Sequence, residues 1–132
     1  MNLRPAQEDA LRDAGARRRE ARLADHLRSL HGALVAGLTD DELARRVHVG
    51  VLRAGAHGIT WDSTLAAYLV LMLQAAPNFD EHPVVRAILA CDEIAPDLRL
   101  DALMELTDDE HWEEIAARRD ERAWEGAPGE TS

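Results

Sequence analysis

The stretch from about residue 60 to residue 76 is apolar on nearly every side of the helix that it predicts. Its centre, residues 65–73, contains no charged side chain and shows no period-two alternation typical of a strand. The apolar run is also well short of the roughly 20 residues that a helix needs to cross a bilayer. A helix without a polar face has to be surrounded by other elements. We therefore expect this segment to be the central helix of a bundle.

The rest of the chain predicts further helices and no strands. Ahead of the central segment, apolar residues recur at helical spacing in Leu23, Leu27, Leu30 and Leu34, and again in Leu43, Val47, Val51 and Ala54. After it we expect helices at residues 81–92, 96–106 and 108–124, with inward-facing Val84, Ile88, Leu89, Leu100, Leu103 and Met104. The sequence thus predicts an all-α fold, a single compact bundle of about five to six helices.

Length and composition indicate one domain. A chain of 132 residues with 46% hydrophobic and 30% charged residues can bury a core of its own. We expect a helical domain over residues 1–125, in which residues 1–22 pack loosely, and a disordered tail at 126–132. The single Cys91 cannot form an internal disulfide, and the amino terminus lacks the apolar run of a signal peptide. These features favour a cytoplasmic protein without a membrane span.

Two short patterns predict helix starts by the same device. In the first, Thr39 would cap a helix and Glu42, three residues later, would complete a capping box. Thr107 and Glu110 repeat this spacing ahead of the last predicted helix. Both threonines are therefore expected to be N-caps.

Residues 77–83, Pro-Asn-Phe-Asp-Glu-His-Pro, raise the question of a metal site. The run of acid, acid and imidazole at 80–82 is consecutive, whereas ligands on one helix face lie three or four residues apart. Capping explains more of the pattern, with Asp80 as N-cap, the second proline in the first turn, and Phe79 packed on Val84 as a hydrophobic staple. We predict that this segment is structural.

Other candidates for chemistry are weak. None of the six histidines pairs with another at four-residue spacing, and Ser29, Ser63 and Cys91 lack the strained turn of an activated nucleophile. The sequence predicts no catalytic, cofactor-binding or metal-binding residue, so we expect a protein that is not an enzyme. A metal-assisted enzyme, with ligands drawn from distant elements, is the alternative.

Charge is distributed unevenly along the chain. Residues 1–58 carry ten Arg against eight acidic residues, whereas residues 59–132 carry five Arg against seventeen, for a net charge of −10. This balance opposes phosphate contacts, so we do not expect a nucleic-acid partner. The basic stretch from Arg17 to Arg22 leaves a nucleic-acid or anionic-surface binder open as an alternative to a solvated helix face.

The last predicted helix combines acidic side chains with a tryptophan. Asp108, Asp109, Glu113 and Glu114 would surround Trp112 on one surface. Such a pattern is typical either of an ordinary exposed face over a core stripe or of a surface that engages a basic partner protein. We take these five residues as the candidate partner-binding site, with the acids steering association and Trp112 as an anchor.

A combination of short segments resembles a known family. It comprises Gly-Ile-Thr at 58–60, Tyr-Leu-Val-Leu-Met at 68–72, Pro-Asn-Phe-Asp at 77–80 with Pro83, Ile-Leu-Ala at 88–90, Pro-Asp-Leu-Arg-Leu-Asp-Ala-Leu at 96–103, and, nearer the amino terminus, His-Leu-Arg at 26–28 and Arg-Arg-Val at 45–47. Together these segments resemble small helical proteins encoded in type VI secretion clusters of Gram-negative bacteria, near spike and effector genes.

The resemblance implies a bacterial, non-catalytic protein-binding module and supplies no catalytic residues or cofactor. Its partner would be a secreted effector or a spike-associated protein, and the acidic carboxy-terminal half suits a target with a basic surface. The module would act either as an accessory or adaptor that helps to load the effector, or as an immunity-type inhibitor that occupies it.

Overall fold

The computed structural model describes residues 5–125, with side chains from residue 14 onward, and within this range every regular element is helical. The elements are α1 (Pro5–Leu30), α2 (Gly32–Val35), α3 (Asp40–Ala56), α4 (Asp62–Gln74), η1 (Phe79–Glu81), α5 (Pro83–Leu89), η2 (Pro96–Leu98), α6 (Arg99–Leu106), α7 (Asp109–Ala117) and η3 (Glu121–Glu125), where η denotes a 3-10 helix. The predicted all-α class is confirmed. The predicted tail at 126–132 lies outside the described residues.

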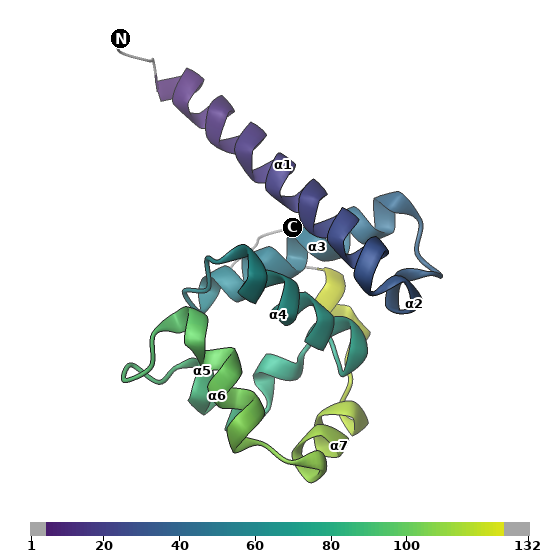
Figure 1. Ribbon diagram of the computed structural model, residues 1–132, viewed down its shortest axis with the longest axis vertical. Helices are drawn as coiled ribbons and strands as arrows, with labels where there is room; N and C mark the ends of the chain where they lie inside the picture. Colours follow the sequence, from purple (N-terminus) through teal and green to yellow (C-terminus); the bar gives the residue numbers. More distant parts are fainter. Residues whose placement is uncertain (1–4, 126–132) are drawn as a thin grey trace.

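Helix α4 occupies the middle of the fold, as its composition predicts. It packs against α1, α2, α3 and α6 (Figure 1), and its buried side chains include Leu65, Tyr68, Leu69 and Met72. One side is not covered, however, because Ala67 is exposed on it. The expectation that this helix is enclosed on every side is therefore wrong for that one side.

Helix α3 lies close against α4 because a glycine faces the contact. A β-carbon added at Gly50 would lie 2.1 Å from Cδ2 of Leu69, far closer than two non-bonded carbons approach each other. Only a residue without a side chain lets the two helices approach this closely. On the same side of α3, Leu43, Val47 and Ala54 are buried in the core.

Helix α1 is the longest element, and its amino-terminal half projects beyond the rest of the molecule (Figure 1). Leu23 and Leu27 of its other half are buried, but Leu30, predicted to face the core, is 67% exposed. The helix ends at Leu30, and the separate turn of α2 follows His31, so the predicted leucine stripe is interrupted at this point.

Two further core predictions and the end of one predicted helix need correction. Met104 is 54% exposed, because α6 turns Leu100 and Leu103 inward and leaves Met104 on its outer side. In α5, Val85 and Leu89 take the buried positions four residues apart, while Val84 is half-buried. The last helix does not extend to residue 124, since α7 ends at Ala117 and the chain turns before η3.

The turn between α7 and η3 is held in place by the side chain of Asn78, from the segment 77–83. The Asn78 amide nitrogen donates to the Arg118 carbonyl at 3.1 Å, and its oxygen accepts from the Asp120 backbone N–H at 2.9 Å. These bonds satisfy backbone groups that the end of α7 leaves unpaired.

None of the helices in the described part of the chain has an apolar stretch of the length needed to span a bilayer.

Candidate functional site

Asp80 lies inside the protein, where its carboxylate ties α3 to α4. It accepts hydrogen bonds from both Nε and a terminal nitrogen of Arg53, the former at 3.2 Å, and from the Tyr68 hydroxyl at 2.6 Å. The His57 ring nitrogen Nε2 lies 3.4 Å from the same carboxylate. Both Asp80 and Arg53 are only 6% exposed. The four side chains form what we call the Asp80 cluster.

The predicted cap at Asp80 is therefore wrong. The N-cap of α5 is His82, whose ring nitrogen Nδ1 accepts from the Val84 backbone N–H at 3.2 Å. Phe79 is not at the staple position of that helix start, because with His82 as N-cap the preceding residue is Glu81. Phe79 is instead fully buried in the core, with its ring centroid 4.8 Å from that of Tyr68. The sequence shows helix-start residues at this point but does not show that Arg53, 27 positions earlier, lies opposite the carboxylate.

The electrostatics of the Asp80 cluster suit a structural tie better than acid–base chemistry. Burial raises the pKa of Asp80, but hydrogen bonds from His57, Arg53 and Tyr68 outweigh it and lower the pKa to about 2. Burial, together with Asp80, raises the pKa of Tyr68 well above its ordinary value. Efficient proton transfer requires a pKa near the working pH, and both groups are moved away from neutrality.

The first predicted capping box is confirmed for Thr39 and is wrong for Glu42, whose carboxylate accepts from the Thr39 hydroxyl and not from the Thr39 backbone N–H. Thr39 is the N-cap of α3, and its hydroxyl accepts from the Glu42 backbone N–H at 3.1 Å. The Glu42 carboxylate lies 3.0 Å from the same hydroxyl and accepts from it.

The second predicted capping box is wrong by one residue. Asp108, not Thr107, is the N-cap of α7, and it exchanges hydrogen bonds with His111 at 3.1 Å in both directions. Glu110 therefore has no part in the capping box. The Thr107 hydroxyl instead donates to a carbonyl of α6 and accepts from the Trp112 indole N–H at 3.1 Å.

The five predicted partner-binding residues lie on α7 and its N-cap, but they are not equivalent. Asp109 and Glu113 are exposed, whereas Asp108 caps α7 and Glu114 lies 2.9 Å from the His82 ring. Trp112 is half-buried, and the bond of its indole N–H to Thr107 limits its freedom to insert into a partner. One side of Trp112 instead lines a surface hollow.

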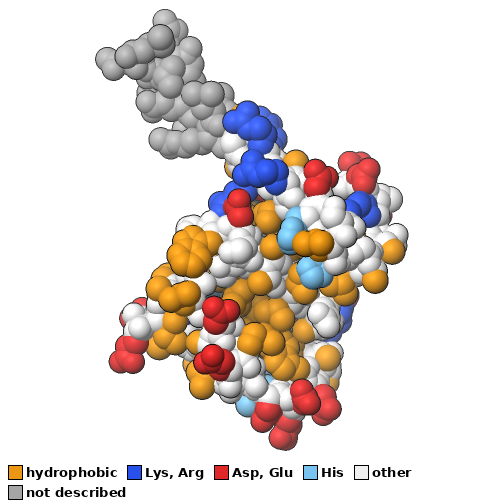
Figure 2. Space-filling view, in the orientation of Figure 1, with side chains coloured by type: hydrophobic (Ala, Val, Ile, Leu, Met, Phe, Trp, Pro, Cys, Tyr) orange, Lys and Arg blue, Asp and Glu red, His pale blue; other side chains and the backbone are white. Residues whose placement is uncertain are grey.

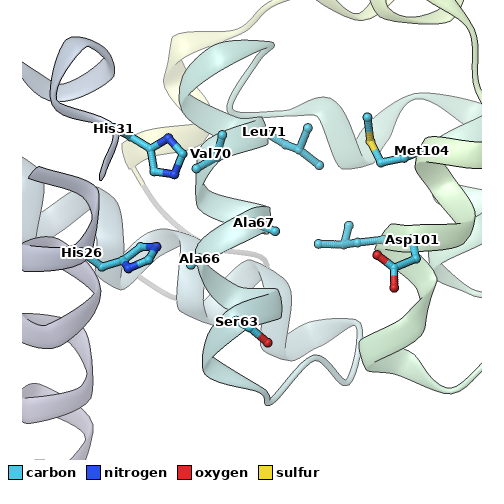
Figure 3. A pocket seen from close by; sticks show the side chains of 10 residues that line it. His26, His31, Ser63, Ala66, Ala67, Val70, Leu71, Asp101 and Met104 are labelled. Atoms are coloured by element: carbon cyan, nitrogen blue, oxygen red, sulfur yellow. The ribbon is translucent and has the colours of Figure 1, made fainter. Parts of the chain in front are cut away.

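This hollow is part of a groove that follows the uncovered side of α4. Its main section, about 390 Å³, has Ala67, Val70 and Leu71 of α4 on its floor (Figure 3). His26 and His31 border it on one side, and α6 borders it on the other with Leu100, Asp101 and Met104. Figure 2 shows apolar side chains gathered in this hollowed part of the surface.

Two further hollows continue the groove at its ends. One, of about 340 Å³, shares Leu71 and Met104 with the main section and reaches Trp112 and Ala116 of α7. The other, of about 320 Å³, shares His26, Ser63 and Ala66 and reaches Arg19 and Arg22. We call the three hollows together the α4 groove. Sequence reasoning missed it because its walls come from α1, α6 and α7, and its main signal was the helix without a polar face.

Charge differs between the two ends of the α4 groove. At the α1 end, Asp62 accepts from Arg19 Nε at 2.7 Å and lies 3.8 Å from Arg22, so two arginines of the predicted basic stretch are engaged within the protein. Along α6, Asp101 borders the groove and Glu105 follows one helical turn later. Figure 2 shows the arginines of α1 at one end and acidic side chains around the apolar hollow.

Within the described residues, no three His, Cys, Asp or Glu side chains converge as the ligands of a metal ion would. We take the α4 groove as the candidate functional site because apolar side chains line its floor on the uncovered side of α4. No family model, curated protein or solved structure matches this chain.

Proposed function

We propose that this chain is a non-catalytic protein-binding module whose docking surface is the α4 groove. The observation that carries the proposal is the uncovered side of α4, where exposed Ala67 and half-buried Val70 and Leu71 lie beside Met104, itself 54% exposed. A helix with no polar face is ordinarily buried on all sides, and contiguous exposed apolar surface marks interaction sites.

The form of the groove favours a protein segment over a small molecule. Small-molecule sites enclose most of their ligand and direct several polar groups at it. The α4 groove, in contrast, is open along its length, and the floor of its main section is apolar. The polar groups that line this section are Asp101, Ser63 and two histidines. An elongated apolar segment would cover this floor, while a compact ligand would leave much of it exposed.

The partner that we propose is a secreted effector or spike-associated protein with a basic surface, bound in the bacterial cytoplasm. The resemblance to proteins encoded in type VI secretion clusters supports the class of partner, and the net charge of −10 supports its basic character. Both an accessory or adaptor role and an immunity-type role fit such a partner, because each requires stoichiometric binding without chemistry.

Site-specific photo-crosslinking tests this proposal in the native bacterium. A photoreactive amino acid placed at Ala67, on the groove floor, should crosslink one partner that mass spectrometry identifies. The matched control is Ala44, an exposed alanine in α3 that lines none of the three hollows. The purified partner should then bind the unmodified protein and fail to bind Ala67→Arg. A partner captured equally at both positions, or one indifferent to Ala67→Arg, would contradict docking in the groove.

A further inference from the structure

We infer that the occupant of the α4 groove is an amphipathic α-helix of a partner protein, with an apolar stripe flanked by Lys or Arg. The inference rests on the proposed docking function and specifies its partner by chemistry. The groove has an apolar floor, two banks of helical side chains, and an acidic rim along α6 and α7.

The floor has the length and regularity that a helix requires. It is formed by residues of α4 at helical spacing, Ser63, Ala67, Val70 and Gln74, which share one side of the helix. A stripe of this length extends for about 18 Å at the rise of an α-helix, which corresponds to roughly three turns of a partner helix. Helices pack by placing their side-chain ridges into grooves of this kind.

Side-chain sizes along the groove also suit a second helix. Ala66 and Ala67 of α4, Ala75 just after its end and Ala116 of α7 are small, so they leave room for a helix backbone to approach. Met104 is flexible and polarisable, and side chains of this type adapt to irregular apolar partners. A partner β-strand would bind less well than a helix, because its backbone N–H and C=O groups need a sheet edge to pair with. No strand occurs in residues 5–125.

The carboxylates beside the groove favour a partner helix with basic residues on its flanks. Asp101 and Glu105 lie on the α6 side, and Asp109 and Glu113 lie next to Trp112 and Ala116 on α7. In the part of the chain that the structure describes, none of these four carboxylates has an ion-pair partner, whereas Asp62 at the other end of the groove is paired with Arg19. Lys or Arg beside an apolar stripe would complement this rim.

A second copy of the chain is a poorer occupant than a basic partner. Each copy has a net charge of −10, so two copies repel each other, and the repulsion rises as salt is lowered. Self-association is nevertheless a distinct outcome of the experiment below.

The test uses three fluorescent model peptides of about four helical turns, roughly 14 residues each. The first has Leu on one helical face and Lys on the other, the second replaces every Lys with Glu, and the third carries a central Pro in the Leu/Lys sequence. Binding to the full chain is followed by fluorescence anisotropy. We expect the Leu/Lys peptide to bind, and the other two peptides to bind at least about tenfold more weakly. The Glu peptide loses charge complementarity with the acidic rim, and the Pro peptide cannot form a continuous helix.

Two protein variants locate the peptide. Asp101→Asn combined with Glu105→Gln should weaken binding about three- to tenfold and flatten its salt dependence. The matched control, Asp92→Asn with Glu93→Gln, removes the same charge from two exposed residues between α5 and α6 and should bind as the unmodified protein does. Ala67→Arg, which obstructs the floor, should abolish binding.

Several results would overturn the inference. Equal binding of the Lys and Glu peptides would reject the basic flanks, equal binding of the Pro peptide would reject a helical occupant, and binding insensitive to Ala67→Arg would place the peptide elsewhere. A concentration-dependent dimer in sedimentation that Ala67→Arg dissociates would assign the groove to a second copy. If a partner is crosslinked at residue 67 but none of the three peptides binds, the docking function is supported and only the basic helix is rejected.

Discussion

At the scale of single residues, Asp80 joins two helices of the core through its buried carboxylate. Its carboxylate connects Arg53 of α3 with Tyr68 of α4, while its neighbours Asn78 and Phe79 contact the turn after α7 and the core. Removing one partner of a buried charge pair leaves the other unpaired away from water. The free energy of folding should therefore depend on this residue more than on any exposed acid.

Substitution of Asp80 by Asn should be severe. Asn caps helices about as well as Asp, so a capping role would make the change nearly silent. Because Arg53 would instead lose its buried partner, we expect Asp80→Asn to lower the free energy of unfolding by about 3–5 kcal/mol, measured by urea denaturation at neutral pH. The control is Asp41→Asn, at an exposed position in α3, which should change it by less than about 0.5 kcal/mol. A silent Asp80→Asn would refute the buried tie.

The Asp80 cluster also predicts how stability depends on pH. The pKa of Asp80 is about 2 in the folded protein and near its ordinary value of 3.8 in the unfolded chain. The folded state thus holds the ionised form more strongly, and this contribution, about 2 kcal/mol, is present in full above about pH 4 and is lost as the pH falls toward 2. The difference between the urea midpoints of the unmodified protein and Asp80→Asn should therefore shrink over this range, by the part that this contribution makes up. A difference that stays constant down to pH 2 would contradict the assigned pKa.

At the scale of elements, the contact of α3 with α4 depends on a missing side chain. Gly50 faces Leu69 at a distance that excludes a β-carbon, whereas a β-carbon added at Gly55, five residues later in the same helix, meets no atom within 4 Å. The two glycines therefore have opposite expected effects when replaced by alanine. Alanine favours the helix at both positions, but only at Gly50 must it also displace a buried leucine.

Thermal or urea unfolding of Gly50→Ala and Gly55→Ala checks this contact. Gly50→Ala should destabilise the protein by roughly 1–2 kcal/mol, since overpacking costs more than the gain in helix propensity. Gly55→Ala should stabilise it by roughly 0.5–1 kcal/mol. If both substitutions stabilise the protein, α3 and α4 do not approach as closely as described.

Elements that depend on local signals could be predicted, and those that depend on distant partners could not. Thr39 caps α3 because its hydroxyl reaches a backbone N–H three residues away, which spacing alone reveals. The end of α7 depends on Asn78, some 40 residues earlier, and no local pattern shows that contact. Met104 fits an inward-facing pattern, yet the orientation of α6 leaves it exposed.

The candidate site, too, could be predicted only in the features that depend on local sequence. The apolar character of α4 and the acidic residues beside Trp112 were visible in the sequence. That these features border one groove depends on how α1, α6 and α7 pack around α4, which the sequence does not show.

At the scale of the whole molecule, the proposed docking surface combines an apolar groove with an acidic rim, and the two features would act on different steps of binding. The floor would contribute affinity through apolar contact, and the exposed carboxylates at the α7 end would steer a basic partner toward it. Rim charges act mainly on association, so the two contributions can be separated by experiment.

Charge reversal on α7 tests the steering. Glu113→Arg should slow association of the crosslinked partner several-fold at low salt and flatten the salt dependence of the association rate, measured by stopped-flow fluorescence. The control is Glu93→Arg, the same change at an exposed residue that borders none of the three hollows. Glu113 is a cleaner choice than Glu114, which is paired with His82. An unchanged rate would remove α7 from the docking surface.

The most direct test of the α4 groove compares the affinities of two matched variants for the crosslinked partner by calorimetry. Ala67→Arg and Ala44→Arg place the same side chain at exposed helical positions, the first on the groove floor and the second outside it. We predict that both unfold at the same temperature, that Ala44→Arg binds as the unmodified protein does, and that Ala67→Arg binds at least about 30-fold more weakly, as for a central interface residue. Equal affinity of the two variants would contradict docking in the α4 groove.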